Sequence, residues 1–236
     1  MRTSPSRPAT ARPTDNDRPE VGSIPPPPSE THVEPNAQGV WDLLDNWGWA
    51  GPTFEEHVEQ MQAQLSDPYH VAFHEGVEAL GKCLGAQTTR LTEAGAPDVV
   101  WTFANDVHIA FEAKTEKKSD AALSKKDLQQ TRGHRDWVCE RLCDGRTTAV
   151  IETVAVSEDP KVHQIGLPFT AGVFHMTPKS LASLVDHVVK VLRDVRIKFS
   201  GRDFAAAAPE LSAVLRNSGL DVKTILKTVT ANPLKK

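Results

Sequence analysis

Two short segments near the middle of the chain alternate between apolar and polar residues. Alternation with a period of two is typical of a β-strand with one buried face, and it runs through residues 99–103 and 107–113. Between them, Asn105 and Asp106 are residues that accept the left-handed backbone of a tight turn. We therefore expect a β-hairpin in which the numbers of facing residues sum to 210. Its apolar face comprises Val99, Trp101, Phe103, Ile109, Phe111 and Ala113.

Apolar residues elsewhere recur every three or four positions, which is typical of amphipathic helices. The stripe in residues 69–84 consists of Tyr69, Phe73, Val77, Leu80 and Leu84. Further helices are expected at residues 41–49, 52–65, 178–199, 206–217 and 222–229, with another that begins after Ser124. Strands are expected at residues 86–91, 147–156 and 169–175, with polar connections at 115–123 and 157–168. This order of elements predicts an α/β fold.

The helix after Ser124 has further features that its sequence makes visible. Asp127 lies three residues after Ser124, which resembles a capping box with Asp in place of Glu. Gly133 within the helix costs about 1 kcal/mol relative to Ala, so we expect another group to approach it closely. The expected inner face comprises Leu128, Thr131, Arg135, Cys139 and Leu142. The long helix at 178–199 begins with Thr177 and Pro178, which suits a first turn.

The N-terminal segment differs in composition from the rest of the chain. Nine of the seventeen prolines lie in residues 1–36, among Ser, Thr and Arg and with few large apolar residues. We expect residues 1–38 to form a disordered arm with partial polyproline II structure. Residues 39–200 should then form the α/β domain and residues 201–236 a helical C-terminal extension.

Composition also indicates the compartment. No run of apolar residues reaches the length of a transmembrane span, and none follows the early arginines as in a signal peptide. We therefore expect a soluble protein with no membrane partner. Cys83, Cys139 and Cys143 do not make a disulfide framework and suit a reducing cytoplasm. An iron–sulfur cluster would need a fourth cysteine, so we exclude one.

The hairpin carries the most informative polar residues of the chain. Its register places Asp98 opposite Glu112, and facing residues on antiparallel strands point to the same side. Lys114, two residues after Glu112, lies on that side as well. Two opposed carboxylates repel each other unless something neutralises them. A divalent cation is the obvious candidate.

Pro97-Asp98, followed by Glu112-Ala113-Lys114, resembles the signature of the PD-(D/E)XK nuclease superfamily, the restriction-endonuclease-like proteins. The resemblance covers roughly residues 69–199 and is closest to prokaryotic stand-alone or helicase-appended nuclease domains. It implies an α-β-β-β-α-β core with a mixed central sheet flanked by helices, so that residues 39–200 would be a nuclease-like domain.

The resemblance also implies a site. Asp98 and Glu112, with the Ala113 carbonyl, would hold Mg²⁺, for which Mn²⁺ is a possible substitute. Lys114 would orient the attacking water or neutralise developing charge, and Gln130 matches a glutamine that braces the site. Many relatives add an acidic residue from the preceding helix. Glu75 is the best positional match but points away from the apolar stripe, and His74 and Glu78 compete with it.

Charge is distributed unevenly. The net charge of −4 does not indicate a nucleic-acid-binding protein, yet residues 97–236 carry twenty-one basic against seventeen acidic side chains. Residues 37–96 carry two basic against nine acidic side chains. The basic residues that follow the motif either contact phosphates or form an ordinary solvated helix face. They are Lys117, Lys118, Lys125, Lys126, Arg132 and Arg135.

Three functions remain open from the sequence. The first is a Mg²⁺-dependent deoxyribonuclease of phage defence or DNA processing, with DNA as partner and a homodimer or a helicase or defence complex as a further assembly. The second is a nuclease-like subunit that binds DNA or assembles with others without cutting. The third is an α/β scaffold with chance motifs, since one fold supports many functions.

Overall fold

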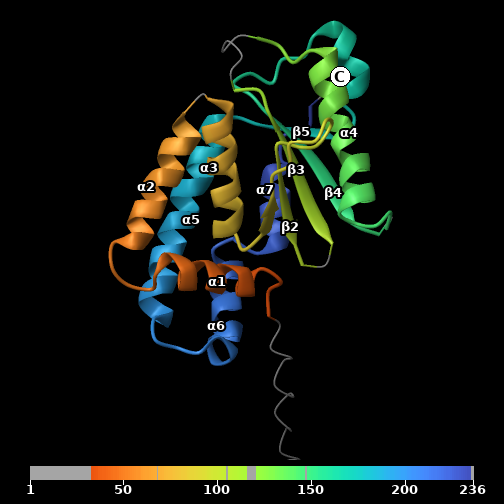
Figure 1. Cartoon of the computed structure of the whole chain (residues 1–236). Helices are drawn as coiled ribbons and strands as arrows, with labels where there is room; N and C mark the ends of the chain where they lie inside the picture. Colours follow the sequence, from red (N-terminus) through yellow and green to blue (C-terminus); the bar gives the residue numbers. More distant parts are fainter. Residues whose placement is uncertain (1–32, 68, 105, 116–120, 147, 235–236) are drawn as a thin grey trace, which may run out of the picture. The chain divides into compact units, whose positions relative to one another are not determined.

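The computed structural model describes residues 33–67, 69–104, 106–115, 121–146 and 148–234 (Figure 1). Within this part of the chain a five-stranded mixed sheet has the order β1-β2-β3-β4-β5. The strands are β1 (Gln87–Thr89), β2 (Val99–Phe103), β3 (Val107–Ala113), β4 (Val150–Val156) and β5 (Val173–Met176). The first three strands pair antiparallel, whereas β3, β4 and β5 pair parallel. The α/β class and the mixed sheet are thus confirmed.

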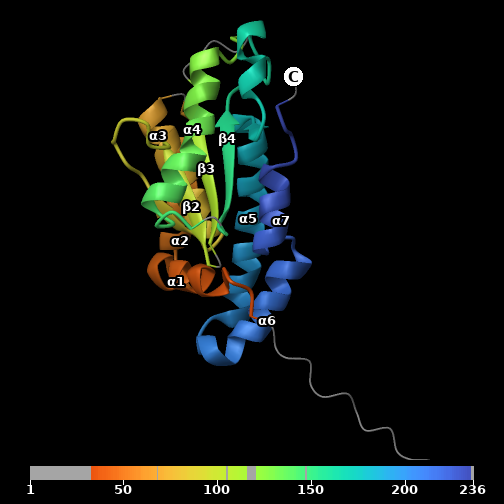
Figure 2. The same ribbon diagram turned by 90° about the vertical axis from the view of Figure 1, so that its right-hand side faces the viewer.

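Helices flank this sheet on both sides. They are α1 (Ala37–Trp47), α2 (Thr53–Ser66), α3 (His70–Cys83), α4 (Lys125–Arg141), α5 (Pro178–Phe199), α6 (Phe204–Asn217) and α7 (Val222–Val229), with the 3₁₀ helix η1 (Gln164–Phe169). Helix α4 covers one face, and α5 lies on the other (Figure 2). Among the described residues, none of the helices is both long and apolar enough to span a membrane.

The register of the β2–β3 hairpin agrees with the sequence. Phe103 pairs with Val107, Trp101 with Ile109 and Val99 with Phe111, so the paired numbers sum to 210 as expected. Asp106 has a φ of 57°, in the left-handed region expected for this turn. The paired ladder ends at Val99, and Asp98 lies in a bend, where its amide donates to the Phe111 carbonyl at 3.0 Å rather than to Glu112. The expected pairing of Asp98 with Glu112 is therefore not part of the ladder, although both side chains line one hollow.

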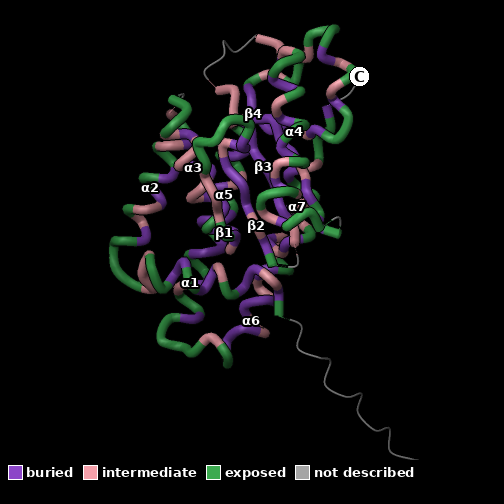
Figure 3. Tube along the Cα trace, turned by 45° about the vertical axis from the view of Figure 1, so that its right-hand side comes forward, coloured by how far each residue is buried: buried purple, intermediate pink, exposed green. Residues whose placement is uncertain are grey.

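Both faces of this hairpin are buried, whereas the alternation predicted one buried face. The predicted apolar face packs into the main core with α1, α2, α3 and α5. On the other face, Val100 and Ala110 pack against Val138 of α4 and Ile151 of β4. The polar residues of that face, His108 and Glu112, are buried as well, and the strands are enclosed along their length (Figure 3).

One close contact fixes helix α3 on the hairpin. The Trp101 indole lies against Gly81, where an added Cβ would be 2.4 Å from Trp101 Nε1 and Cδ1. The same indole donates a hydrogen bond to the Val77 carbonyl at 2.9 Å. Since Gly81 and Val77 lie on one ridge of the helix, this contact sets its rotation and height. It thereby places His74, one turn further toward the N-terminus, beside the start of β2.

The cap of α4 and the start of α5 were predicted correctly, but the inner face of α4 was not. Ser124 and Asp127 form a capping box, as do Thr177 and Ser180 at α5. In α4, His134 and Val138 are buried where Arg135 and Cys139 were expected. Helix α4 is mostly polar, so its few apolar residues do not define its buried face to better than about one residue. Nothing in the described chain lies within 4 Å of a Cβ added at Gly133, so the expected close approach is absent there.

Three strands begin or end differently from the prediction, and one of them, β4, starts at Val150 rather than at residue 147. Strand β1 keeps only Gln87–Thr89 of the expected residues 86–91. Strand β5 begins at Val173 rather than at residue 169, because η1 occupies Gln164–Phe169 and contains Pro168. Proline cannot donate to a strand ladder, and Gly172 makes a left-handed turn with a φ of 78° just before the strand.

Both ends of the described chain belong to the same core. Asn36, which the sequence placed in the arm, is 1% exposed and donates hydrogen bonds to the Leu84 and Leu220 carbonyls, both at 2.8 Å. The structured part therefore includes residues 33–38, and the predicted arm at residues 1–32 lies outside the described residues. At the other end, Leu211 and Leu215 of α6 enter the main core. The C-terminal helices are integral to this domain.

Candidate metal and phosphodiester site

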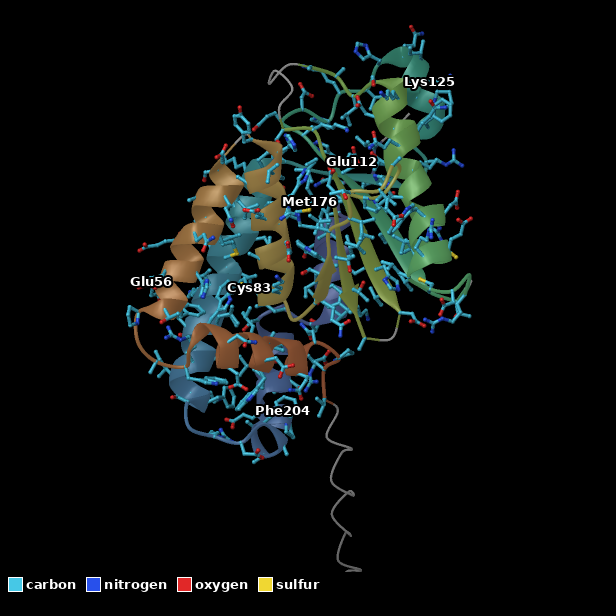
Figure 4. All side chains as sticks on the ribbon, viewed as in Figure 1. Glu56, Cys83, Glu112, Lys125, Met176 and Phe204 are labelled. Atoms are coloured by element: carbon cyan, nitrogen blue, oxygen red, sulfur yellow. The ribbon has the colours of Figure 1, made fainter. Side chains whose placement is uncertain are left out.

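The carboxylates of Asp98 and Glu112 lie at the carboxyl end of β3, between the N-terminal halves of α3 and α4. Figure 4 labels Glu112 at this end of the sheet. A hollow of about 400 Å³ opens here. Its lining is His70, His74, Asp98, Glu112, Ala113, Lys114, Thr115, Asp127 and Gln130. The three residues of the sequence motif thus share one wall of a single hollow.

Asp98 is held from two directions. Its Oδ2 accepts a hydrogen bond from the Ala113 amide at 2.7 Å. His74 Nε2 lies 3.3 Å from the same oxygen, within ion-pair distance when the histidine is protonated. Burial alone would raise the pKa of Asp98, but His74, the Ala113 amide and Lys114 together lower the pKa below its ordinary value. The Asp98 side chain is therefore an anion at neutral pH.

Glu112 is almost fully buried and has basic partners on both oxygens. Its side chain is 1% exposed. Lys114 Nζ contacts Oε1, and His134 Nε2 lies 2.6 Å from Oε2. His134 itself is fully buried on the inner face of α4. A carboxylate this deeply buried requires such compensation.

Each ring nitrogen of His134 lies beside an oxygen acceptor. Its Nδ1 lies 3.2 Å from the Gly95 carbonyl and its Nε2 faces the Glu112 carboxyl group. A neutral imidazole has one N–H, so the tautomer decides which of the two nitrogens donates. His74, Lys114 and His134 thus surround the two carboxylates with basic groups.

Other predicted members of the site also line the hollow. Gln130 projects into it from α4, four residues before His134. Ala113 lines it too, and its amide rather than its carbonyl makes the observed contact with Asp98. Asp127 adds a third carboxyl group to the lining, although its Oδ2 also caps α4 by accepting from the Ser124 amide at 2.7 Å.

Glu75 lies away from this hollow, in contrast to the first choice from the sequence. Its carboxylate accepts from Gln64 Nε2 at 2.9 Å and lies 3.4 Å from Arg90 Nη1. Its side chain is 44% exposed. The helix residue that reaches Asp98 is His74, one of the two competitors. The other, Glu78, pairs with Lys82 at 2.6 Å and lies 3.5 Å from Arg90.

The basic residues proposed to contact nucleic acid are spread around α4. Lys125 Nζ lies over the Phe169 ring of η1 at 5.3 Å from its centroid, and Arg135 lies near Glu152 of β4. Lys126 precedes Gln130 by one helical turn and so lies on its ridge. Arg132 is exposed on another side of the helix. Lys117 and Lys118 lie outside the described residues.

Two carboxyl groups in this hollow, those of Asp98 and Glu112, fit a hard divalent ion in type, because such ions prefer oxygen ligands. The imidazole nitrogen of His74 is a softer donor, more typical of zinc and iron sites. Mg²⁺ usually keeps several waters and takes one or two protein carboxylates, and the hollow has room for such a hydrated ion. Within the described ranges, no three His, Cys, Asp or Glu side chains are already grouped to hold a metal. Lys114 and His134 would have to release at least one Glu112 oxygen for it to bind.

The sequence reasoning missed His70 and His134. His70 and His74 are four residues apart on α3, with ring centroids 5.9 Å apart, and both line the hollow. The spacing i, i+4 places two side chains on one helix face and could have drawn attention to them. His134 falls on the ridge of Thr131 and Val138, so a correct rotation of α4 would have shown a buried polar residue.

No protein-family model, curated protein or solved structure matches this chain. The interpretation of the site therefore rests on its residues and their arrangement.

Proposed function

We propose that this chain is a divalent-metal-dependent nuclease that hydrolyses phosphodiester bonds in DNA, with a restriction-endonuclease-like core. The observation that carries the proposal is the arrangement of Asp98, Glu112 and Lys114 in one hollow at the end of the β2–β3 hairpin. The order α3–β1–β2–β3–α4–β4, with its mixed sheet, supports it. So does the position of Gln130 on the helix that follows the motif.

In the proposed hydrolysis, each residue of the site has its own role. Asp98 and Glu112 would hold Mg²⁺ or Mn²⁺, with the Ala113 carbonyl, and His74 takes the place considered for Glu75. A bound divalent ion supplies an acidified water and stabilises charge on the attacked phosphate. Lys114 places a positive charge beside the same carboxylates and neutralises charge that develops on the phosphate oxygens. Gln130 donates from its amide to orient the substrate or water at the opposite wall.

The proposal also specifies the substrate, the compartment and the partners of the protein. DNA is the substrate, and the reducing cytoplasm suits three free cysteines. Cutting both strands of a duplex would be served by a homodimer or by a helicase or defence complex that presents two sites. Lys126 is the basic residue best placed to hold a phosphate near Gln130.

The test is incubation of the purified protein with supercoiled and linear DNA, and with RNA, in Mg²⁺, in Mn²⁺ and in EDTA. We expect metal-dependent cleavage of DNA, with losses of more than about 100-fold for Asp98→Ala and for Glu112→Gln. Glu59→Ala, on the exposed side of α2, is the matched control and should cleave normally. Absence of cleavage under every condition, or undiminished cleavage by Asp98→Ala, would remove the proposal.

A second function is favoured by one observation. Both oxygens of Glu112 already have basic partners inside the protein, Lys114 and His134. A nuclease-like subunit that binds without cutting would have this internal neutralisation in place of a metal. This second function predicts that Mg²⁺ and Mn²⁺ leave the melting temperature of the protein unchanged. A rise that Asp98→Ala abolishes would instead favour the enzyme, because a ligand that binds only the folded state stabilises it.

A further inference from the structure

A second hollow opens beside the site and continues it. Its volume is about 660 Å³, within the range of about 300–1,000 Å³ typical of small-molecule pockets. It shares His70, His74, Asp98 and Gln130 with the first hollow. Its far wall is the segment of residues 90–96 that leads into β2. A molecule bound at Asp98 and Glu112 would therefore extend into this space.

The lining of the second hollow suits a flat, uncharged group. Val71 and Leu91 present apolar side chains that are 48% and 39% exposed and so can contact a bound molecule. His70 and His74 supply imidazole rings at the junction with the first hollow. Imidazole rings and guanidinium planes are platforms on which unpaired nucleobases stack, and Arg90 provides such a guanidinium.

The charges of the lining exclude the sugar-phosphate backbone from this space. Three carboxylates, of Glu78, Glu93 and Asp98, outnumber the one guanidinium of Arg90. Arg90 is itself 3.5 Å from Glu78 and 3.4 Å from Glu75. Phosphates bind where basic groups predominate. The neutral part of a nucleotide, its base, is the part that matches apolar walls and ring edges.

The segment of residues 90–96 is linked to Glu112 through the side chain of His134. The Gly95 carbonyl lies 3.2 Å from His134 Nδ1, and His134 Nε2 lies 2.6 Å from Glu112. Gly95 has a φ of 84°, a left-handed conformation that glycine adopts readily. The wall of the second hollow and Glu112 are therefore held by one buried histidine.

We propose that the second hollow binds an unpaired nucleobase of the strand whose phosphodiester lies at Asp98 and Glu112. This inference rests on the proposed function and specifies its substrate: single-stranded DNA, or the unpaired end of a duplex. A base within an intact duplex is stacked and paired, so it cannot enter the hollow without being extruded.

The experiment separates base binding from cleavage by working in EDTA with the full-length protein. The probes are a short single-stranded oligodeoxynucleotide that contains 2-aminopurine, a blunt hairpin duplex of the same sequence, and that duplex with an unpaired end. We expect affinity for the first and third probes to exceed that for the blunt duplex by about tenfold, from stacking of one base. 2-Aminopurine fluorescence should change on binding.

Variants test the position of the base. Leu91→Asn and Val71→Asp should lower single-strand affinity by about tenfold and abolish the fluorescence change, with no loss of duplex affinity. Both residues are exposed, so folding should be preserved, which a melting curve checks. Ile197→Asp, on a side chain that is 84% exposed and does not line the hollow, is the control and should bind normally.

The outcomes distinguish this inference from the proposed function. Equal affinity for the three probes, or single-strand affinity unchanged in Leu91→Asn and Val71→Asp, overturns the inference. If the protein then still cleaves blunt duplex DNA in Mg²⁺, the nuclease proposal stands without it. Conversely, Leu91-dependent single-strand binding without cleavage of any substrate supports base recognition and rejects the enzyme.

Discussion

His134 Nε2 lies 2.6 Å from Glu112 Oε2, and the two side chains, from α4 and β3, are 0% and 1% exposed. The pair joins the helix that carries Gln130 to the strand that carries the motif. Leaving a buried polar group without its hydrogen-bond partner typically costs about 1–3 kcal/mol, and more for a charged group. This hydrogen bond acts together with the apolar packing of Leu128 and Val138 to hold α4 against the sheet.

We predict that His134→Phe lowers the free energy of unfolding by about 3 kcal/mol, measured by urea denaturation at neutral pH. His134→Gln retains an N–H donor for Glu112 and should lose less. If the site binds a metal, its Mn²⁺ affinity should fall about 10–100-fold in His134→Phe, as for other residues that support a ligand. Equal losses in the two variants, with Mn²⁺ affinity unchanged, would show that His134 only fills space.

Gly81→Ala should disturb the contact that positions α3. A methyl group there would lie 2.4 Å from Trp101, inside the van der Waals distance. Forcing an atom into a packed core typically costs about 1–3 kcal/mol, which exceeds the gain of up to about 1 kcal/mol from helix propensity. We therefore expect a net loss of unfolding free energy in urea. The loss should shrink in the Trp101→Phe background, since the smaller ring removes the clash; an equal loss there would contradict this account.

Local sequence patterns were sufficient to predict the register of the β2–β3 hairpin and the cap of α4. Alternation and turn residues predicted the register from Val99 to Phe111, because side-chain period and turn length together leave one solution. The register does not extend to Asp98 and Glu112, but the same hairpin end brings both side chains to one hollow. The capping box at Ser124 was equally local, since it involves residues three positions apart, whereas for α5 only the start at Thr177 and Pro178 was predicted and not its capping box.

Contacts between distant elements were not accessible in this way. His74 reaches Asp98 because Gly81 lets Trp101 approach α3, and no pattern within α3 contains that information. The rotation of α4 was misjudged by one residue because its apolar positions are few, which hid His134 and misplaced Arg135. The residues missed or misassigned at the site are thus those whose side-chain direction depends on helix packing.

Gly133→Ala should stabilise the protein. A Cβ there meets nothing within 4 Å, and the residue lies inside α4 with no left-handed φ. Replacing an exposed helical glycine by alanine typically gains about 0.5–1 kcal/mol. We expect the melting temperature to rise by about 2–4 °C per kcal/mol for a chain of this size. Gly145→Ala is the matched control: space is open there too, but its φ of 73° should make alanine destabilising.

The stability of the folded protein should fall with acidity because of a buried histidine, His175, which lies two strands away from Glu112 in the sheet. His175 is 4% exposed, and burial lowers its pKa, although the Ser157 carbonyl and Asp159 partly offset the effect. The folded protein therefore keeps His175 neutral at pH values where the unfolded chain, with a pKa near 6.5, binds a proton. Stability from this source is complete above about pH 6.5 and is lost as the pH falls toward the lowered pKa.

Urea denaturation between about pH 5 and pH 8 measures this effect. One such histidine contributes a slope of at most about 1.4 kcal/mol per pH unit. His108 is also buried with a lowered pKa and adds a slope of the same sign. We expect His175→Gln, which keeps a donor for the Ser157 carbonyl, to have a shallower acid slope than the wild type. His163→Gln, on an exposed loop, should leave the slope unchanged. If the wild type, His175→Gln and His163→Gln have the same slope, groups other than His175 cause the acid sensitivity.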